Sequence, residues 1–325
     1  MNPLSNSYIY QAKKLNMHAL KFDWNPSTGI DIIGNFKIHY YSLMWLTAFV
    51  IGWYIMKRIY TREKVSLEYL DPLFLYTVLA TMLGARLGHV LFYQPELITE
   101  DFFSIFLPFR FKGGFEFTGF QGLASHGATI GIIISMYLYR KKYTYKSLMW
   151  IFDRIVIPVA SGAVFIRFGN FINSEIIGKE SGDFPLGVRL IQEQYGKREI
   201  MQLTGINDYK EAYAAVTNNP QFANLLEAIP YRHPAQLYES FCYVILFFIL
   251  WFVYTKTAKS EKTGFLFGLF LVLLWTIRFF VEFVKEAQNV ERSDWSLNTG
   301  QWLSIPFILI GLYFMFMYKP KTTVK

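Results

Sequence analysis

The sequence predicts an all-α membrane protein with about seven transmembrane helices. Of its 325 residues, 53% are hydrophobic and only 17% are charged, whereas soluble domains carry roughly 25% charged residues. The apolar residues gather in runs that approach the roughly 20 residues needed to cross a bilayer core. Basic residues lie in the short turns between these runs, so the net charge of +8 indicates membrane topology rather than nucleic-acid binding.

Seven apolar segments account for the predicted helices, and we expect one polytopic membrane unit over residues 1–325. No apolar core follows Met1, so we expect no cleavable signal peptide. A long polar stretch, residues 173–239, separates the fourth and fifth segments. The seven segments cover residues 38–56, 71–92, 122–139, 148–172, 240–254, 264–284 and 301–317.

Charge determines the predicted orientation. The turns after the first, third and fifth segments and the C-terminal tail are rich in Lys and Arg, whereas the alternate stretches (1–37, 93–121, 173–239 and 285–300) are acidic or balanced. Basic loops stay on the cytoplasmic side. We therefore expect the N-terminus outside, the C-terminus in the cytoplasm, and residues 173–239 as a head segment on the outer side of the membrane.

Charged side chains inside membrane segments need a reason, because each costs about 2.5–3.5 kcal/mol at a helix centre. Arg86, Arg167 and Arg278 all lie late in outward-going segments, so we expect them in the outer half of the membrane. Their three positive charges exceed the negative charges of the two nearby acids, which suggests an anionic partner. A planar guanidinium suits a phosphate group. The six such residues are Arg86, Asp153, Arg154, Arg167, Arg278 and Glu282.

Four of these charges also have a structural interpretation. Arg278 and Glu282 stand four residues apart and could neutralise each other on one helical face. Asp153 could pair with an inward arginine. Arg154 could extend its charged end to the cytoplasmic interface.

A polar strip begins at the end of the fourth segment. It supports the expectation of an anionic partner such as phosphate, and capping of the helix end is the alternative. A helix break is expected before Gly178. The strip consists of Arg167, Asn170, Asn173, Ser174 and Glu175.

Two histidines stand at the starts of predicted helices. At His126 the positive end of the helix dipole favours a neutral imidazole, which can accept a proton; a capping or interfacial histidine is the alternative. His233 opens a motif that also holds Gln236 and Glu239, and capping explains much of it. The histidines show no metal-ligand spacing, and the single cysteine, Cys242, lies in an apolar run, so no metal site is predicted.

Taken together and in this order, these segments resemble the bacterial prolipoprotein diacylglyceryl transferase family. The resemblance implies transfer of the diacylglyceryl group of phosphatidylglycerol to the lipobox cysteine thiol of a prolipoprotein signal peptide. Glycerol phosphate would be released, and no cofactor would be needed. The blocks that carry the resemblance hold Tyr41, Gly84 to Tyr93, Ser125 to Gly127, Asp153, Arg167 to Gly178, His233 to Glu239, and Arg278 with Glu282.

The resemblance also implies roles for single residues. His126 would take the thiol proton, and Arg167 and Arg278 would stabilise the departing phosphate. Glu282 would orient Arg278. The resemblance also implies a bacterial inner-membrane protein with residues 173–239 as a periplasmic head segment; from the sequence itself, this segment could either cap the bundle or dock the prolipoprotein. The expected substrate-binding residues are Tyr41, Arg86, Asn170, Asn173, Glu175, Gly178, His233 and Glu282.

A transporter or flippase of an anionic lipid or solute is the alternative function. Inward arginines at one depth would suit it equally well. Against it, the sequence shows none of the paired repeats that many transporters have.

Overall fold

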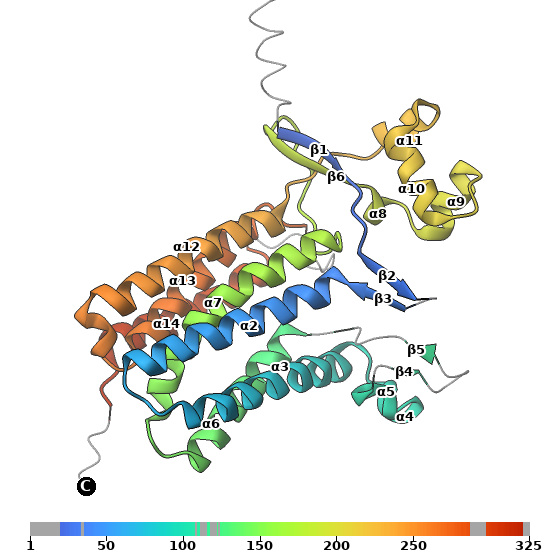
Figure 1. Cartoon of the computed structure of the whole chain (residues 1–325). Helices are drawn as coiled ribbons and strands as arrows, with labels where there is room; N and C mark the ends of the chain where they lie inside the picture. Colours follow the sequence, from blue (N-terminus) through green and yellow to red (C-terminus); the bar gives the residue numbers. More distant parts are fainter. Residues whose placement is uncertain are drawn as a thin grey trace, which may run out of the picture.

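The computed structural model describes residues 20–33, 36–107, 109–110, 116–117, 122, 124–286 and 297–320. Long helices form a bundle, and a smaller mixed layer lies at one end of it (Figure 1). A helix occurs at each of the seven predicted segments. These helices are α2 (Tyr40–Arg62), α3 (Leu70–Tyr93), α6 (Ser125–Lys142), α7 (Leu148–Ile172), α12 (Ala235–Lys256), α13 (Phe265–Val281) and α14 (Thr299–Leu312), the last continuing as a π-helical turn over Tyr313–Met317.

In the part of the chain that the structure describes, four helices are long and apolar enough to cross a membrane. They cover Leu67–Tyr93, Leu148–Ile172, Ala235–Lys256 and Thr299–Met317, and α13 is a shorter apolar helix. Large apolar side chains such as Leu75 and Phe248 are more than half exposed on their outer faces, where lipid would cover them. The prediction of a mostly helical membrane protein is therefore confirmed.

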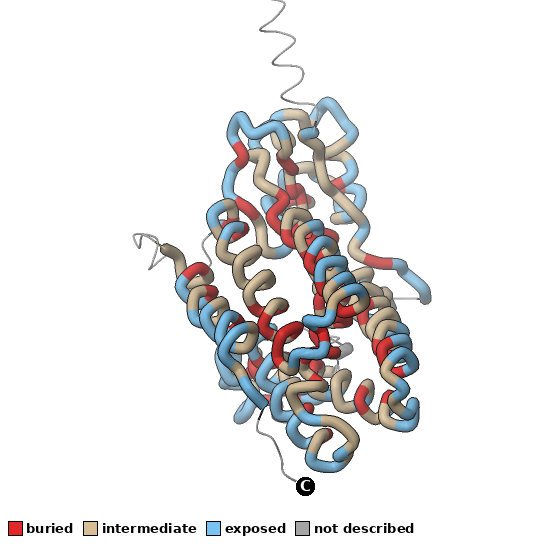
Figure 2. The backbone as a smooth tube through the Cα atoms, turned by 90° about the vertical axis from the view of Figure 1, so that its left-hand side faces the viewer, coloured by how far each residue is buried: buried red, intermediate tan, exposed pale blue. Residues whose placement is uncertain are grey.

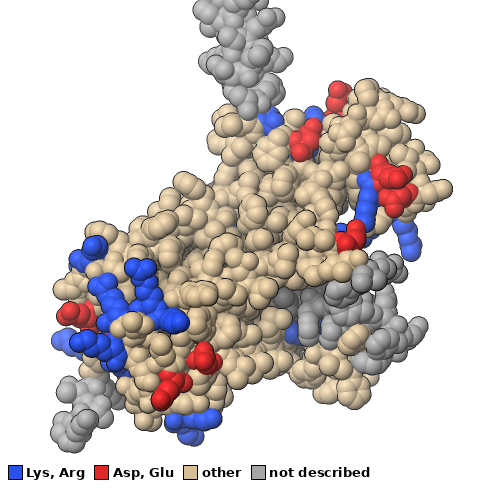
Figure 3. All heavy atoms as spheres, viewed as in Figure 1, with Lys and Arg blue, Asp and Glu red and all other residues tan. Residues whose placement is uncertain are grey.

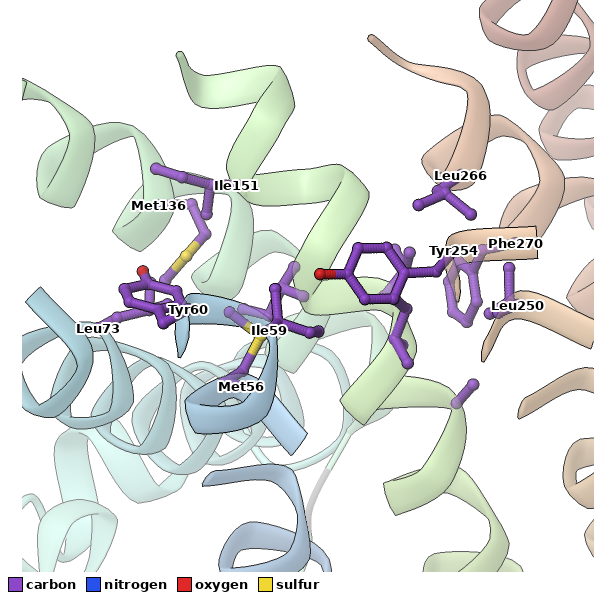
Figure 4. Close-up of a cluster of buried hydrophobic side chains, with 14 of the residues drawn as sticks. Met56, Ile59, Tyr60, Leu73, Met136, Ile151, Leu250, Tyr254, Leu266 and Phe270 are labelled. Atoms are coloured by element: carbon purple, nitrogen blue, oxygen red, sulfur yellow. The ribbon is translucent and has the colours of Figure 1, made fainter. Parts of the chain in front are cut away.

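α7 is the central helix of the bundle. In its apolar 18-residue stretch 56% is buried, against 28% or less in the corresponding stretches of the other three candidate spans. The helix packs on α2, α12 and α13. The core lies where these helices meet α3 and α6: Ile59, Ile151, Leu250 and Leu266 are fully buried. Figure 4 shows such side chains converging from different helices, and Figure 2 shows buried positions toward the middle of the bundle.

α3 and α6 pack through glycine. A Cβ atom on Gly88 would lie 2.6 Å from the Cα atom of Gly127. Only residues without a side chain permit this approach of two helix backbones, a common device in membranes. Between α3 and α6 the structure has two short helices, α4 (Leu97–Glu100) and α5 (Phe103–Phe106), and two short strands, β4 (Phe109–Arg110) and β5 (Glu116–Phe117).

The layer beyond the bundle combines residues 173–239 with the N-terminal strands. Strand β1 (Leu20–Trp24) pairs in parallel with β6 (Leu186–Leu190), and β2 (Gly29–Ile33) pairs antiparallel with β3 (Phe36–His39). Ile200, Tyr213 and Val216 form a small separate core. The helices of this layer are α8 (Ile191–Gln194), α9 (Lys197–Thr204), α10 (Tyr209–Asn218) and α11 (Ala223–Glu227), with a short 3-10 turn at Pro220–Phe222. Two other 3-10 turns belong to the bundle: Leu67–Tyr69 precedes α3, and Ala258–Glu261 precedes α13.

Trp24, in β1, fastens this layer to the end of α7. Its indole Nε1 donates to the carbonyl oxygen of Phe171 at 3.0 Å, and the two rings stack with centroids 4.4 Å apart. The sequence did not predict that an N-terminal strand belongs to the head segment.

Candidate functional site

Arg167 and Glu239 form a buried ion pair between α7 and α12. The Arg167 Nε atom lies 2.5 Å from Glu239 Oε2, and 14% and 1% of the two side chains are exposed. Tyr243, one turn after Glu239, is also buried and lies within electrostatic range of both Arg167 and Arg278. The two arginines predicted to be catalytic, one from α7 and one from α13, therefore both lie within electrostatic range of one buried tyrosine.

Arg278 carries a buried donor without an acceptor. Within the described residues its Nε atom makes no hydrogen bond, and its guanidinium packs over the Trp275 ring, 5.3 Å from the centroid. A buried donor left unpaired costs about 1–3 kcal/mol. An anion with oxygen acceptors would remove that cost.

The expected pair between Arg278 and Glu282 is not formed. Glu282 Oε2 lies instead 3.2 Å from the Nζ atom of Lys285. The physical reason is that α13 ends at Val281, so Glu282 caps the helix and turns toward the following residues. Its carboxylate packs against the start of α14, where a Cβ on Gly300 would lie 2.6 Å from the carboxylate carbon.

The polar strip at the end of α7 is a turn rather than a continuous helical face. Asn170 Nδ2 donates to Glu175 Oε2 at 3.1 Å, and Asn173 Nδ2 donates to Glu175 Oε1 at 3.2 Å. Ser174 and Ile176 have φ values of 56° and 59°, a left-handed conformation that is unfavourable for side chains other than glycine. This strained turn folds the Glu175 carboxylate back over the helix end.

Tyr41 joins α2 to this turn. A Cβ on Gly169 would lie 2.7 Å from Tyr41 Cδ2, so the glycine lets the ring lie directly on α7. The Tyr41 side chain interacts with Asn170 and lies within electrostatic range of Arg167 and Glu175. The structure thus brings together five predicted site residues: Tyr41, Arg167, Asn170, Asn173 and Glu175, with Arg278 reached through Tyr243.

Gly178 and His233 close the loop beyond this turn. A Cβ on Gly178 would lie 2.2 Å from the carbonyl oxygen of His233, and the His233 amide donates to the carbonyl of Lys179 at 2.9 Å. The His233 Nδ1 atom lies 3.3 Å from the Tyr238 hydroxyl. Burial lowers the pKa of His233. These contacts are structural, and a direct role in substrate binding stays a prediction for both residues.

Arg86 and His126 belong to the α3–α6 side of the molecule. Arg86 donates from Nε to the carbonyl of Ile105 at 3.2 Å and from Nη2 to the carbonyl of Ser104 at 2.9 Å, which fastens α5 to α3. His126 is exposed at the start of α6, with its ring 5.0 Å from that of Phe92. Among the described residues, no contact joins His126 to the pair of arginines Arg167 and Arg278 (the arginine pair).

Asp153 and Arg154 have structural partners far from the turn. The Asp153 carboxylate accepts hydrogen bonds from the backbone amides of Gly264 at 2.7 Å and Phe267 at 2.9 Å, and so caps the N-terminus of α13. Arg154, for which extension to the cytoplasmic interface was one interpretation, pairs through Nε with Glu63 Oε1 at 2.8 Å. Its Nη1 atom lies 3.9 Å from Asp153, a looser contact than the two capping bonds.

The sequence pattern did not single out Glu239 and Tyr243 as site residues. Glu239 carried a usable signal, because it is an acid that enters an apolar helix, and α12 begins at Ala235 rather than at the predicted residue 240. A tyrosine in such a helix carries no comparable signal. In the part of the chain that the structure describes, no group of three or more His, Cys, Asp or Glu side chains gathers as a metal site would.

Comparison with known proteins identifies the family. The family model described as prolipoprotein diacylglyceryl transferase matches residues 28–317. The chain belongs to this family. Its relatives include phosphatidylglycerol–prolipoprotein diacylglyceryl transferases, so the resemblance drawn from the sequence is confirmed.

Three relatives show how far the family likeness extends. The protein of Bacteroides fragilis is 38% identical over 313 residues, covering 96% of this chain and 100% of that protein. The protein of Tolumonas auensis is 34% identical over 294 residues, covering 90% and 96%. That of Porphyromonas gingivalis is 32% identical over 299 residues, covering 90% and 93%.

Proposed function

We propose that this chain transfers the diacylglyceryl group of phosphatidylglycerol to the lipobox cysteine thiol of a prolipoprotein and releases glycerol phosphate. One observation carries the assignment of the site: the buried Nε of Arg278 has no acceptor among the described residues, and Arg278 and Arg167 lie within electrostatic range of the same buried Tyr243. Membership of the family and the names of its relatives support the same two substrates.

The chemistry requires stabilisation of a departing phosphate. The cysteine sulfur forms a bond to the glycerol carbon that bears the phosphate, and the bond from that carbon to the phosphate oxygen breaks. The bonding pair leaves with glycerol phosphate, so negative charge grows on that oxygen. Donors that bind this charge more tightly than the starting diester lower the barrier, and Arg167 and Arg278 are the donors.

Glu239 would keep Arg167 in position. Its carboxylate lies against the Nε edge of the guanidinium, which fixes the plane of the fork. Arg167, Arg278 and Glu239 together leave one positive charge, which matches the single negative charge of the lipid phosphate. A second uncompensated charge at this depth would cost free energy before any lipid bound.

The turn after α7 would hold the polar headgroup of the lipid. Asn170 and Asn173 fix the Glu175 carboxylate, and carboxylate oxygens accept hydrogen bonds from hydroxyl groups. Phosphatidylglycerol presents glycerol hydroxyls there. Tyr41, packed on Gly169, would line the same space from α2.

His126 would accept the proton of the thiol. The thiolate is the nucleophile, and a free cysteine with a pKa of about 8.5 is mostly protonated at neutral pH. His126 is exposed and so can be reached by a substrate from outside the bundle. A His126→Gln variant should lose more activity at pH 7 than at pH 9, where the thiol ionises without help. Near-normal turnover across that pH range would exclude the histidine as base.

The expected topology is part of the proposal: seven membrane spans, the N-terminus outside, and the candidate site and residues 173–239 on the periplasmic side of a bacterial inner membrane. Lys and Arg gather at the end of the bundle where α2 and α12 finish (Figure 3). In a Cys242→Ala background, an impermeant thiol reagent applied to spheroplasts should label Lys210→Cys and leave Lys146→Cys unlabelled. The opposite pattern would reverse the orientation.

Release of glycerol phosphate tests the activity directly. Purified protein in micelles that contain phosphatidylglycerol would receive a synthetic lipobox peptide or the same peptide with serine in place of cysteine. Release should depend on the cysteine. No release by folded protein would overturn the transferase assignment, and accelerated lipid exchange between leaflets would then favour the flippase alternative.

A further inference from the structure

A basic pocket lies where α2 and α12 end, at the opposite end of these helices from Tyr41 and Glu239. Its volume is about 380 Å³. The lining residues come from two helices and include three cations and no acid. They are Arg58, Arg62, Trp251, Thr255 and Lys256.

The arginines of this pocket are held by groups that carry no negative charge. Arg62 Nη2 donates to the carbonyl oxygen of Thr255 at 2.8 Å, and its guanidinium lies 5.3 Å from the Tyr254 ring centroid. The Arg58 guanidinium lies 5.6 Å from the Trp251 ring centroid. Both arginines are therefore positioned, but their charges are not neutralised by these contacts.

The nearest acid in sequence is already engaged. Glu63 accepts from Arg154 Nε at 2.8 Å through one oxygen and from Trp150 Nε1 at 2.9 Å through the other. Both of its oxygens thus face α7. The three cations of the pocket keep a net positive charge among the residues that line it.

Helix ends explain only part of this cluster. Cations in the last turn of a helix interact favourably with its dipole, which accounts for Arg62 in α2 and Lys256 in α12. Arg58 lies before the last turn of α2. The dipole also gives no reason for cations of two helices to line one pocket beside a tryptophan.

The spacing along the helices places this pocket at the other surface of the membrane. Seventeen residues separate Tyr41 from Arg58 in α2, and seventeen separate Glu239 from Lys256 in α12. At about 1.5 Å per residue this is about 26 Å, close to the roughly 30 Å thickness of a bilayer core. A ligand here would come from the leaflet opposite the candidate active site.

We propose that this pocket binds the phosphate group of an anionic phospholipid from that opposite leaflet. Two guanidinium groups and an ammonium group suit a phosphate diester. A tryptophan beside them suits the depth of lipid headgroups, and basic pockets between membrane helices bind such headgroups. The site is separate from the arginine pair of the reaction, so it stands independently of the proposed transfer activity.

Native mass spectrometry of the purified full chain in micelles tests the proposal, with phosphatidylserine as probe and phosphatidylethanolamine as the lipid without net charge. The Arg58→Gln/Arg62→Gln variant should retain one phosphatidylserine fewer than the wild type, or bind it at least tenfold more weakly. A Lys141→Gln/Lys142→Gln variant removes the same charge from exposed positions at the end of α6 and should bind as the wild type does. Thermal unfolding checks that each variant is folded, and Arg58→Gln alone replaces the double variant if it is not.

Three results would overturn the proposal. Equal retention by the pocket variant and the wild type would show that the pocket holds no lipid. An equal loss in the Lys141→Gln/Lys142→Gln variant would show unspecific attraction. Displacement of the lipid by millimolar glycerol phosphate, in the wild type alone, would assign the pocket to a soluble phosphate ester instead.

Discussion

Replacing Arg278 by lysine separates the charge of this residue from its geometry. Lysine keeps one positive charge but lacks the Nε atom and the second terminal nitrogen. In the structure the Nε atom is buried without an acceptor, so we expect it to donate to the phosphate once lipid is bound. The substitution therefore removes one or two charge-assisted hydrogen bonds to the leaving group.

The size of the effect follows from the number of bonds lost. A hydrogen bond to a charged group contributes about 1.5–3 kcal/mol, and each 1.36 kcal/mol is a factor of about ten in rate. We expect kcat/KM of Arg278→Lys to fall by about 10- to 100-fold for each bond. Because the charge on the phosphate grows during the reaction, most of the loss should be in kcat rather than in KM.

Glycerol phosphate release with the lipobox peptide is the assay. Arg154→Lys is the matched control, since Arg154 is also a buried arginine in a membrane helix but pairs with Glu63, away from the site. The control should keep a kcat close to that of the wild type. If Arg278→Lys kept more than half of the wild-type kcat/KM, the assignment of its guanidinium to the phosphate would be wrong.

Three further predictions follow from single contacts. Asp153→Ala leaves two backbone amides of α13 without their acceptor, so the midpoint of thermal unfolding should fall by an amount equivalent to about 1–3 kcal/mol per amide, with a smaller fall for Asp153→Asn; an unchanged midpoint would exclude the capping role. Gly178→Ala places a Cβ atom 2.2 Å from a backbone oxygen and should lower both stability and turnover, by more than about 1 kcal/mol in stability, whereas Gly196→Ala, with its nearest contact at 4.0 Å, should be tolerated in both assays. Burial lowers the pKa of His233 below its ordinary value of 6.5, so protonation favours the unfolded state and stability declines as the pH falls below about 6.5; between pH 8 and pH 5.5 the unfolding temperature should fall further for the wild type than for His233→Gln, and equal falls would contradict this.

The bundle was accessible from the sequence because bilayer physics leaves a strong pattern. Apolar runs and basic turns gave α7 its observed bounds of Leu148 and Ile172. The fifth segment was predicted too short, starting at residue 240 instead of Ala235, because Gln236 and Glu239 look like loop residues until a buried partner is known. The outer layer carries weaker signals, and nothing local indicates that residues 20–24 form a strand with residues 186–190.

The sequence predicted the candidate site only in part, because it indicates the depth of each charged residue in the membrane but not its partner. Arg86, Arg167 and Arg278 were all predicted at one depth, and depth alone does not distinguish Arg86, which bonds to α5, from the two that lie near Tyr243. The choice of partner depends on which helix faces touch and where helices end. Glu282 pairs with Lys285 because α13 ends one residue earlier, and Asp153 caps α13 because α7 passes the start of that helix. Neither fact can be read from the spacing of charges.

The parallel pairing of β1 with β6 has a consequence for biosynthesis. Leu20 emerges from the ribosome early, but its partner Leu186 follows only after α2, α3, α6 and α7. Pairing of segments so distant in sequence is slow, although the equilibrium cost of closing a long loop grows only slowly with its length. The pairing that brings Trp24 to Phe171, beside Asn170, can therefore form only after α2, α3, α6 and α7 have been made. Arg278 is made later still, so the candidate site is complete only when both this slow pairing and the insertion of α13 have taken place.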